Sequence, residues 1–128
     1  MIVGKEFTFD AAHFLPGYDG KCANLHGHTY RLRVEIKGDL DIETGMVVDF
    51  GDLKQIVKDA VVDKLDHTLL NDCLMFEFSK PTAEVMSTKI FSELWKAWSD
   101  SKLPGVVYRV RLWETPTSWC IVEREDVW

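Results

Sequence analysis

The chain has 128 residues, of which 46% are hydrophobic and 28% are charged, and its formal net charge at pH 7 is −6. This length and composition predict one globular domain with a full hydrophobic core and exclude a globally disordered chain. The acidic balance argues against a nucleic-acid partner, and no apolar run suits a membrane span or a signal-peptide core, so we expect a cytoplasmic protein with neither a nucleic-acid nor a membrane partner.

The first third of the chain is expected to form two β-strands. Residues 2–14 are predicted as a strand whose alternate residues share one face, namely Phe7, Phe9, Ala11 and His13. Proline, glycine and aspartate mark a loop before the second strand, which is expected over residues 28–37. Charged residues occupy one face of this strand, and its apolar face carries Tyr30, Leu32, Val34 and Ile36.

The rest of the chain predicts two helices followed by two strands. The first helix is expected to be capped by Asp52 and to end near Leu65, and its apolar side consists of Leu53, Ile56, Val57, Ala60, Val61 and Leu65. The second begins after Pro81 with Thr82 as its N-cap, and its buried stripe consists of Met86, Ile90, Leu94 and Trp98. Strands over residues 106–114 and 118–123 are joined by a turn at Pro116. This order predicts an α+β domain with a four-stranded antiparallel sheet and two helices on one face.

Three of the four histidines are placed to meet at one end of the first two strands. His26 and His28 flank Gly27, and residues two apart on an extended chain point to the same side. If the two strands pair, His13 arrives beside them, and three neutral nitrogen ligands leave one position of a tetrahedral zinc open for catalysis. The alternative is that His13 is a partly buried strand residue and that the HGH segment is a polar turn, because short motifs often match by chance.

Cys22 lies just before these histidines, in the segment CANLHGH. It is either a fourth zinc ligand, which would make the site closed and structural, or a reactive thiol in a glycine-rich loop near a cation. The spacing alone does not separate these two hypotheses. Cys73 and Cys120 are interpreted as small structural residues, and an odd number of cysteines argues against a disulfide framework.

Two further places carry acid–base side chains. Asp66 and His67 are adjacent after the first helix, where the carboxylate would fix the imidazole tautomer in a proton relay. The alternative is that Asp66 caps a turn and His67 interacts with the helix dipole. Glu114 ends the apolar face of its strand, and a carboxylate there is costly to bury unless it meets a donor such as a guanidine-like ligand edge. Otherwise the strand simply emerges into solvent at Glu114.

The motifs follow one another over nearly the whole chain: FDAAH, CANLHGH, DF-x-DLK at Asp49 to Lys54, LDH-x-x-LN, PT-x-E at Pro81 to Glu84, and ETPTS. In this order and spacing the chain resembles the 6-pyruvoyl-tetrahydropterin synthase superfamily. The short interval between Cys22 and the HGH segment is most similar to the 6-carboxy-5,6,7,8-tetrahydropterin synthase branch, which belongs to queuosine biosynthesis. The pyruvoyl-forming branch typically has a longer insertion there, and a folate-linked branch carries glutamate in place of the cysteine.

The resemblance implies the tunnelling fold, in which the sheets of several subunits join into a barrel. It also implies a homo-oligomer, with trimers stacked into hexamers and active sites between subunits. Zinc is the implied cofactor, held by His13, His26 and His28, and Cys22 is then the proton-abstracting thiol.

The remaining roles are also implied by the resemblance. Asp66 and His67 become the proton relay, Glu114 holds the pterin ring, and Thr82 is a second substrate-binding residue. The implied substrate is 7,8-dihydroneopterin triphosphate, which would yield 6-carboxy-5,6,7,8-tetrahydropterin, acetaldehyde and triphosphate.

Three alternatives stay open at this point. The first alternative is a pyruvoyl-forming synthase, and the second is a non-catalytic pterin-binding protein of the same fold. The third is a structural zinc module with Cys22 as the fourth ligand. The sequence also offers several basic residues for the triphosphate without ranking them: Lys21, Arg31, Arg33, Lys80 and Arg109.

Overall fold

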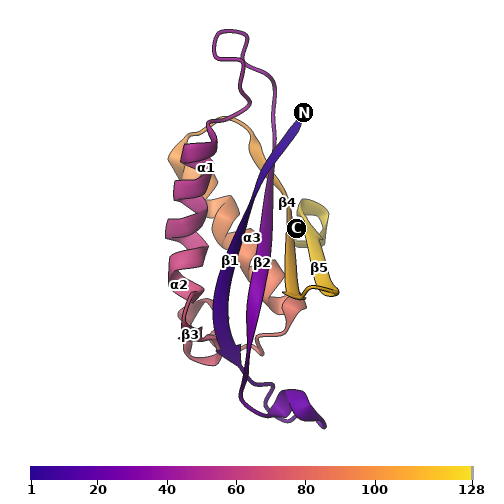
Figure 1. Cartoon of the computed structure of the whole chain (residues 1–128). Coiled ribbons are helices and arrows are strands. Elements are labelled where there is room, and N and C mark those ends of the chain that lie inside the picture. The colour runs from indigo at the N-terminus through magenta and orange to yellow at the C-terminus, as the bar shows by residue number, and fades with distance from the viewer. Residues whose placement is uncertain (128) are drawn as a thin grey trace.

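The computed structural model describes residues 1–127 and shows the α+β fold that the sequence predicts (Figure 1). Its strands are β1 (Ile2–His13), β2 (His26–Lys37), β3 (Thr68–Leu69), β4 (Val106–Thr115) and β5 (Ser118–Glu123). Its α-helices are α1 (Phe50–Val57), α2 (Asp63–Leu65), α3 (Ala83–Ser101) and α4 (Arg124–Val127). The π-helical turn η2 (Lys58–Val62) joins α1 to α2, and the short 3-10 turns are η1 (Lys21–Ala23), η3 (Leu70–Asp72) and η4 (Leu74–Phe76).

The strands of this part of the chain form one five-stranded sheet in the order β3-β1-β2-β4-β5. The four long strands pair antiparallel, as predicted. The fifth strand is a correction, because β3 runs parallel to β1 and pairs Thr68 with Ala11 and Leu69 with Ala12. A two-residue strand carries no alternating pattern, which is why the sequence predicts four strands and an entirely antiparallel sheet.

The pairing of β1 with β2 sets the position of the histidines. The two strands stay in register from Ile2 opposite Lys37 to His13 opposite His26. The first strand therefore ends one residue earlier than predicted, and the second begins two residues earlier. The earlier start places both histidines of the HGH segment inside the strand, where alternation fixes the side to which they point.

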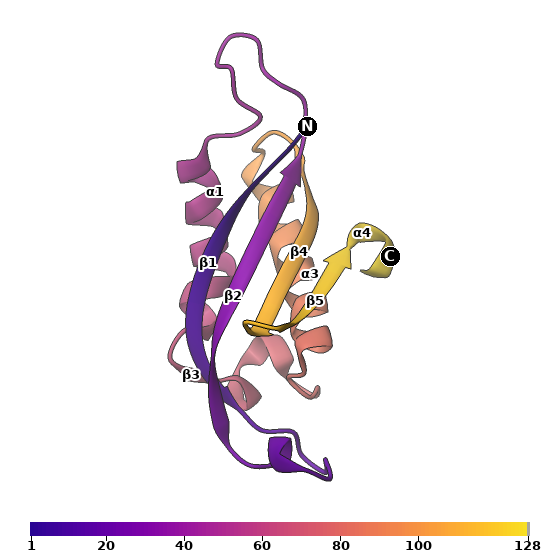
Figure 2. The ribbon, with the colours of Figure 1, turned by 45° about the vertical axis from the view of Figure 1, so that its right-hand side comes forward.

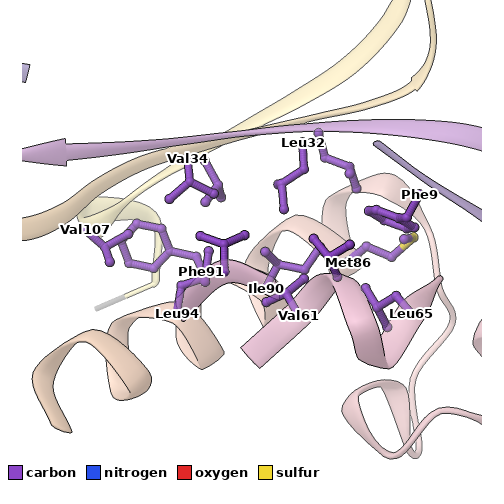
Figure 3. Packing of buried hydrophobic residues seen from close by; sticks show 14 of the residues in the cluster. Phe9, Leu32, Val34, Val61, Leu65, Met86, Ile90, Phe91, Leu94 and Val107 are labelled. Atoms are coloured by element: carbon purple, nitrogen blue, oxygen red, sulfur yellow. The ribbon is translucent and has the colours of Figure 1, made fainter. Parts of the chain in front are cut away.

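The hydrophobic core lies between one face of the sheet and the helices α1 and α3, which stand behind the sheet in Figure 2. The inward residues of β2 are fully buried, as predicted, and they are Tyr30, Leu32, Val34 and Ile36. Figure 3 shows Leu32 and Val34 directed from the sheet toward Met86 and Ile90 of α3. Burying each such side chain contributes about 1.5–3 kcal/mol, so this layer fixes how α3 sits on the sheet.

The helix starts differ in how well the sequence predicts them. The cap of α3 is confirmed, because the Thr82 hydroxyl accepts a hydrogen bond from the backbone N–H of Val85 at 3.2 Å. The predicted Asp52 cap of the first helix is wrong. Asp49 is the cap, and its carboxylate accepts from the N–H groups of Gly51 at 2.6 Å and Asp52 at 3.3 Å. The first free N–H groups lie two and three residues after the cap, so the earlier aspartate satisfies them.

No helix within residues 1–127 is both long enough and apolar enough to cross a membrane.

Candidate metal centre and acid–base pair

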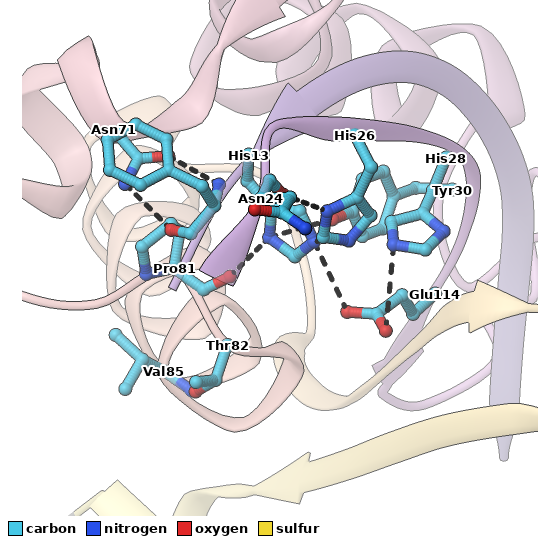
Figure 4. Close-up of polar contacts among 11 residues, drawn as sticks. His13, Asn24, His26, His28, Tyr30, Asn71, Pro81, Thr82, Val85 and Glu114 are labelled. Carbon is cyan, nitrogen blue, oxygen red and sulfur yellow. Dashed lines mark hydrogen bonds and ion pairs between the residues drawn. The ribbon is translucent and has the colours of Figure 1, made fainter. Parts of the chain in front are cut away.

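Three imidazoles meet at the end of the β1–β2 hairpin, which confirms their predicted convergence. His13 lies directly opposite His26 in the ladder, and His28 follows two residues later on the same side. The ring centroids are 4.6 Å apart for His13 and His26, 5.1 Å for His13 and His28, and 4.9 Å for His26 and His28. One nitrogen from each ring lies within 4.8 Å of the other two, so the three histidines together offer the ligands for one metal ion (Figure 4).

The tautomers of two of these rings follow from their carbonyl partners. The Nδ1 atom of His13 lies 2.8 Å from the carbonyl oxygen of Pro81, and the Nδ1 atom of His26 lies 2.7 Å from that of Asn24. A carbonyl oxygen only accepts hydrogen bonds, so each Nδ1 carries the proton and donates it. Each neutral ring then keeps its lone pair on Nε2, which is the form that a metal ligand requires.

The two Nε2 atoms of His13 and His26 face each other at 3.1 Å. Two lone pairs at this distance repel each other unless a cation or a proton lies between them. Tetrahedral zinc with Zn–N bonds of about 2.0–2.1 Å separates its nitrogen ligands by about 3.3–3.4 Å, close to the observed spacing. The pair is therefore arranged as zinc-binding imidazoles commonly are, with a backbone carbonyl holding the far nitrogen of each ring.

His28 and Glu114 complete this cluster. The Nε2 atom of His28 is buried and has no hydrogen-bond partner in the described chain, and it lies 3.7 Å from Oε1 of Glu114. The other carboxylate oxygen of Glu114 lies 3.9 Å from Nε2 of His13. Burial lowers the pKa of His28, against the opposing effect of Glu114, and so favours the neutral imidazole. The three histidines thus fit a bound zinc ion, and the carboxylate lies beside the position that such an ion would occupy.

Asp66 and His67 form a second, separate acid–base group. The Nδ1 atom of His67 lies 3.0 Å from Oδ1 of Asp66, while 77% of the His67 side chain is exposed. The backbone N–H of Asp10 donates to the Asp66 carboxylate at 2.9 Å, and the backbone N–H of His67 donates to the carbonyl of Asp10 at 2.6 Å. The Asp10 hydrogen bond is the main reason that the pKa of Asp66 is lowered, and His67 adds to the effect. Asp66 is therefore held as a carboxylate beside an accessible imidazole, as a relay requires.

The backbone at His67 is unusual. Its φ angle is 59°, in the left-handed region that side chains other than glycine rarely adopt. The hydrogen bonds to Asp10 hold this turn, since they fix the chain immediately before β3 against β1. Such a conformation costs about 1–3 kcal/mol and recurs at functional sites, where the surrounding structure maintains it.

Asp10 itself is a residue that the sequence prediction missed. Its carboxylate accepts a hydrogen bond from the Thr29 hydroxyl at 2.5 Å, and it groups with Asp66 and His67 within 4.8 Å. Asp10 and Thr29 belong to the opposite strand faces from His13 and His28, and with His67 they line an open hollow of about 560 Å³. The available signal was the alternation of β1, which turns Asp10 away from the core.

The remaining predicted site residues, Cys22 and Thr82, come from other segments of the chain. Cys22 lies in η1 and is half-buried, and its thiol belongs to neither of the two groups within residues 1–127. The histidine cluster therefore offers three possible ligand atoms, and the thiol is not among them. Thr82 follows Pro81, whose carbonyl orients His13, and Figure 4 shows Thr82 at the start of α3 below the cluster. One chain thus presents the predicted residues as three sets rather than as one closed site.

Known proteins are similar to this chain over most of its length. The sequence profile of the family described as 6-pyruvoyl tetrahydropterin synthase matches residues 2–125. A Haemophilus influenzae relative named 6-carboxy-5,6,7,8-tetrahydropterin synthase is 45% identical over an alignment 139 positions long, gaps included, and the alignment covers 92% of this chain and 95% of the relative. A Synechocystis protein of the same name is 43% identical, with 91% and 88% covered. The human 6-pyruvoyl tetrahydrobiopterin synthase is 33% identical, with 96% and 91% covered.

The solved structures agree with the sequence relatives. The structure of Caenorhabditis elegans 6-pyruvoyl tetrahydropterin synthase superposes with a TM-score of 0.85 at 28% identity, covering 96% of this chain and 94% of that one. Coverage this complete on both sides means that the two chains share the whole fold. The chain belongs to the 6-pyruvoyl tetrahydropterin synthase family.

Proposed function

We propose that this protein is a zinc-dependent lyase that converts 7,8-dihydroneopterin triphosphate to 6-carboxy-5,6,7,8-tetrahydropterin, with release of acetaldehyde and triphosphate, in queuosine biosynthesis. The observation that carries the zinc dependence is the pair of Nε2 atoms of His13 and His26, which face each other at 3.1 Å with their protons held on the far side of each ring. The choice of product is supported by the relatives at 43–45% identity that bear the carboxy-synthase name.

The histidine cluster supplies the binding position for the reacting side chain of the substrate. Zinc bound there would act as a Lewis acid toward substrate hydroxyl and carbonyl oxygens. Glu114 lies within 4 Å of two of the imidazoles, where its carboxylate accepts paired hydrogen bonds from the amino and ring N–H groups of a pterin. This contact orients the pterin relative to the cluster, and orientation of this kind accounts for a large share of enzymatic rate enhancement.

We assign the proton transfers to Cys22 and to the Asp66–His67 pair. Cys22, as a thiolate, removes a proton next to the pterin ring, and His67 takes or returns a proton at the side chain of the substrate. Asp66 holds Nδ1 of His67 and so leaves Nε2 facing outward for this exchange. Asp10 and Thr29, which lie beside Asp66 and His67, are on the opposite strand faces from His13 and His28. We therefore propose a site completed by two subunits, with His67 of one chain serving the cluster of another.

The sheet supports an oligomer in which barrels form from several chains. β5 ends the sheet on one side, and on the other side only two residues of β1 are paired by β3. Unpaired strand edges template further pairing, and closure into a barrel removes them. We therefore propose a cytoplasmic homo-oligomer, with trimers stacked into hexamers. Light scattering would measure the mass of this assembly and so test the number of subunits.

A product assay tests the proposed reaction. The zinc-loaded protein is incubated with 7,8-dihydroneopterin triphosphate, the pterin is analysed by mass spectrometry and acetaldehyde is trapped. Carboxy-tetrahydropterin together with acetaldehyde is expected. Pyruvoyl product without acetaldehyde would assign the chain to the activity named for the human relative. Absence of turnover with zinc bound would contradict the lyase and favour a pterin-binding protein.

A further inference from the structure

The face of the sheet opposite the helices carries a cluster of three arginines and two tryptophans. We call it the arginine patch, and it consists of Arg31 and Arg33 of β2, Arg111 and Trp113 of β4, and Trp119 of β5. The Arg31 guanidinium lies 3.8 Å above the Trp113 ring, that of Arg33 lies 5.3 Å from it, and that of Arg111 lies 5.2 Å from it and 4.8 Å from Trp119. We propose that the arginine patch binds a triphosphate group.

The positive charge of the patch is mostly uncompensated. Arg33 pairs with Glu6 at 2.8 Å, but Arg31 and Arg111 form no ion pair with any residue of 1–127. The Nε atom of Arg111 is buried and lacks a hydrogen-bond partner in the same part of the chain. Three guanidinium groups therefore share one carboxylate, on a protein whose net charge is −6.

The strand register brings these like charges together. Arg33 lies directly opposite Arg111 in the β2–β4 ladder, and Arg31 is two residues further along the same face. Like charges directly across a ladder are destabilising. In the next row Arg109 has two carboxylates instead, those of Glu35 at 3.3 Å and Glu123 at 2.8 Å. Acidic residues are thus supplied beside the patch but not within it, and a bound anion would remove the repulsion.

The stacking leaves the arginines suited to phosphate. Arg31 packs over the Trp113 ring and forms no ion pair with any residue of 1–127, so its N–H groups can pair bidentately with phosphate oxygens. Arg33 already donates from Nε and Nη2 to Glu6, and a phosphate would compete for that contact. The rings also restrict the side chains, so less conformational entropy is lost when an anion binds. A linear polyanion with several oxygens matches several such N–H groups better than a single carboxylate does.

The position of the patch connects it to the proposed reaction. Thr29, which lines the hollow with Asp10 and His67, is two residues from Arg31 on the same face of β2, a separation of about 7 Å along the strand. The choice of triphosphate rests on the proposed function, in which the substrate carries this group and the products include it. The group has two sources, the tail of the bound substrate or the free ion after release.

Calorimetric titration of the full-length zinc-loaded protein with inorganic triphosphate tests the binding. We expect saturable binding that weakens at least about tenfold in Arg31→Gln and again in Arg111→Gln, the fold-change expected for loss of one charged hydrogen bond. Arg124→Gln is the matched control, because it removes the same charge from a guanidinium that lies 5.1 Å from Trp95, outside the patch. Absence of saturable binding, or an equal loss in the control, overturns the proposal.

Two further measurements separate the sources and the rival explanation. A raised KM for 7,8-dihydroneopterin triphosphate in Arg31→Gln shows that the patch holds the substrate tail, whereas weaker product inhibition by triphosphate at unchanged KM shows that it holds the free ion. Dissociation of the oligomer in Arg31→Gln with triphosphate affinity unchanged means that the face is a subunit contact, and overturns the proposal. Because the titration needs no turnover, failure of the lyase reaction and failure of the patch are distinguishable.

Discussion

The backbone N–H of Asp10 donates to the carboxylate of Asp66 across 2.9 Å, although 56 residues separate the two in the chain. This bond joins the middle of β1 to the turn that carries His67, and the reciprocal bond from His67 N–H to the Asp10 carbonyl closes the pair at 2.6 Å. The acid–base pair is therefore built by tertiary pairing. Its electrostatic consequences are open to direct measurement.

The lowered pKa of Asp66 predicts a specific dependence of stability on pH. A carboxyl whose folded-state pKa is depressed stabilises the fold above its unfolded pKa of about 3.9, and this contribution is lost as pH falls through the folded value. The melting temperature of Asp66→Asn should thus lie below wild type at pH 7, and the difference should shrink below about pH 4. A difference that stays constant into acid would contradict the role of Asp10. In a His67→Ala background the difference in melting temperature should still decrease at acidic pH, but by less. The Asp10 hydrogen bond remains there, and it is the larger cause of the lowered pKa of Asp66.

Removal of one cluster histidine should remove the metal. His28→Ala is expected to reduce zinc from about one ion per chain to a small fraction, as measured by atomic emission on dialysed protein, because two imidazoles hold zinc far more weakly than three. His67→Ala is the matched control, since this fourth histidine lies in the other group and should leave the zinc content unchanged. Full zinc occupancy in His28→Ala would rule out the proposed ligand set.

The carboxylate of Glu114 should be required for pterin binding rather than for metal binding. Glu114→Gln keeps the size of the side chain but replaces one acceptor oxygen by a donor, so it opposes the N–H groups of a pterin. We expect zinc content to stay near the wild-type value, while the affinity for a non-reacting pterin falls about tenfold or more in a fluorescence titration. Loss of zinc with pterin affinity intact would reverse the assignment.

Cys22 should be needed for turnover but not for zinc. Its thiol belongs to neither described group, so Cys22→Ala is expected to keep the metal and to abolish product formation. Zinc content and product yield are measured on the same preparation. If the variant instead loses its zinc, the thiol is a ligand and the structural zinc hypothesis returns.

Substitutions at Thr82 separate its role as the cap of helix α3 from its proposed role in substrate binding. Thr82→Ala removes the cap of α3 and is expected to cost about 1 kcal/mol, or about 4 °C in melting temperature. Thr82→Ser keeps the hydroxyl and should remain close to wild type in calorimetry. A substrate-binding role would appear separately, as a KM change in Thr82→Ser without a stability change.

Alternation and helical periodicity predicted most of the frame that positions the site. The buried face of β2 and the stripe of α3 follow directly from residues such as Leu32, Val34, Ile90 and Leu94, because apolar spacing reports which side of an element is buried. The histidine cluster followed from the same alternation once β1 and β2 were assumed to pair. Periodicity did not distinguish Asp49 from Asp52 as a cap, since both precede the same apolar stripe.

The parts that escaped prediction depend on contacts between distant segments. β3 forms because Thr68 and Leu69 reach β1, and the role of Asp10 depends on the turn at His67, whose left-handed backbone no local pattern announces. The arginine patch likewise needs the β2–β4 register, which sets Arg33 opposite Arg111. The sequence shows each of these residues, but it does not show which residues from distant segments lie beside them in the fold.

The unbroken ladder from Ile2–Lys37 to His13–His26 ties the alignment of β1 and β2 to the geometry of the histidine cluster. A slip of β2 by one residue against β1 would turn His26 and His28 to the face opposite His13 and so dismantle the three-ligand cluster. Only one alignment of this long hairpin brings the three histidines together, so a metal bound to them would stabilise that alignment alone. Bound zinc would thus favour the native β1–β2 register over alignments shifted by one residue.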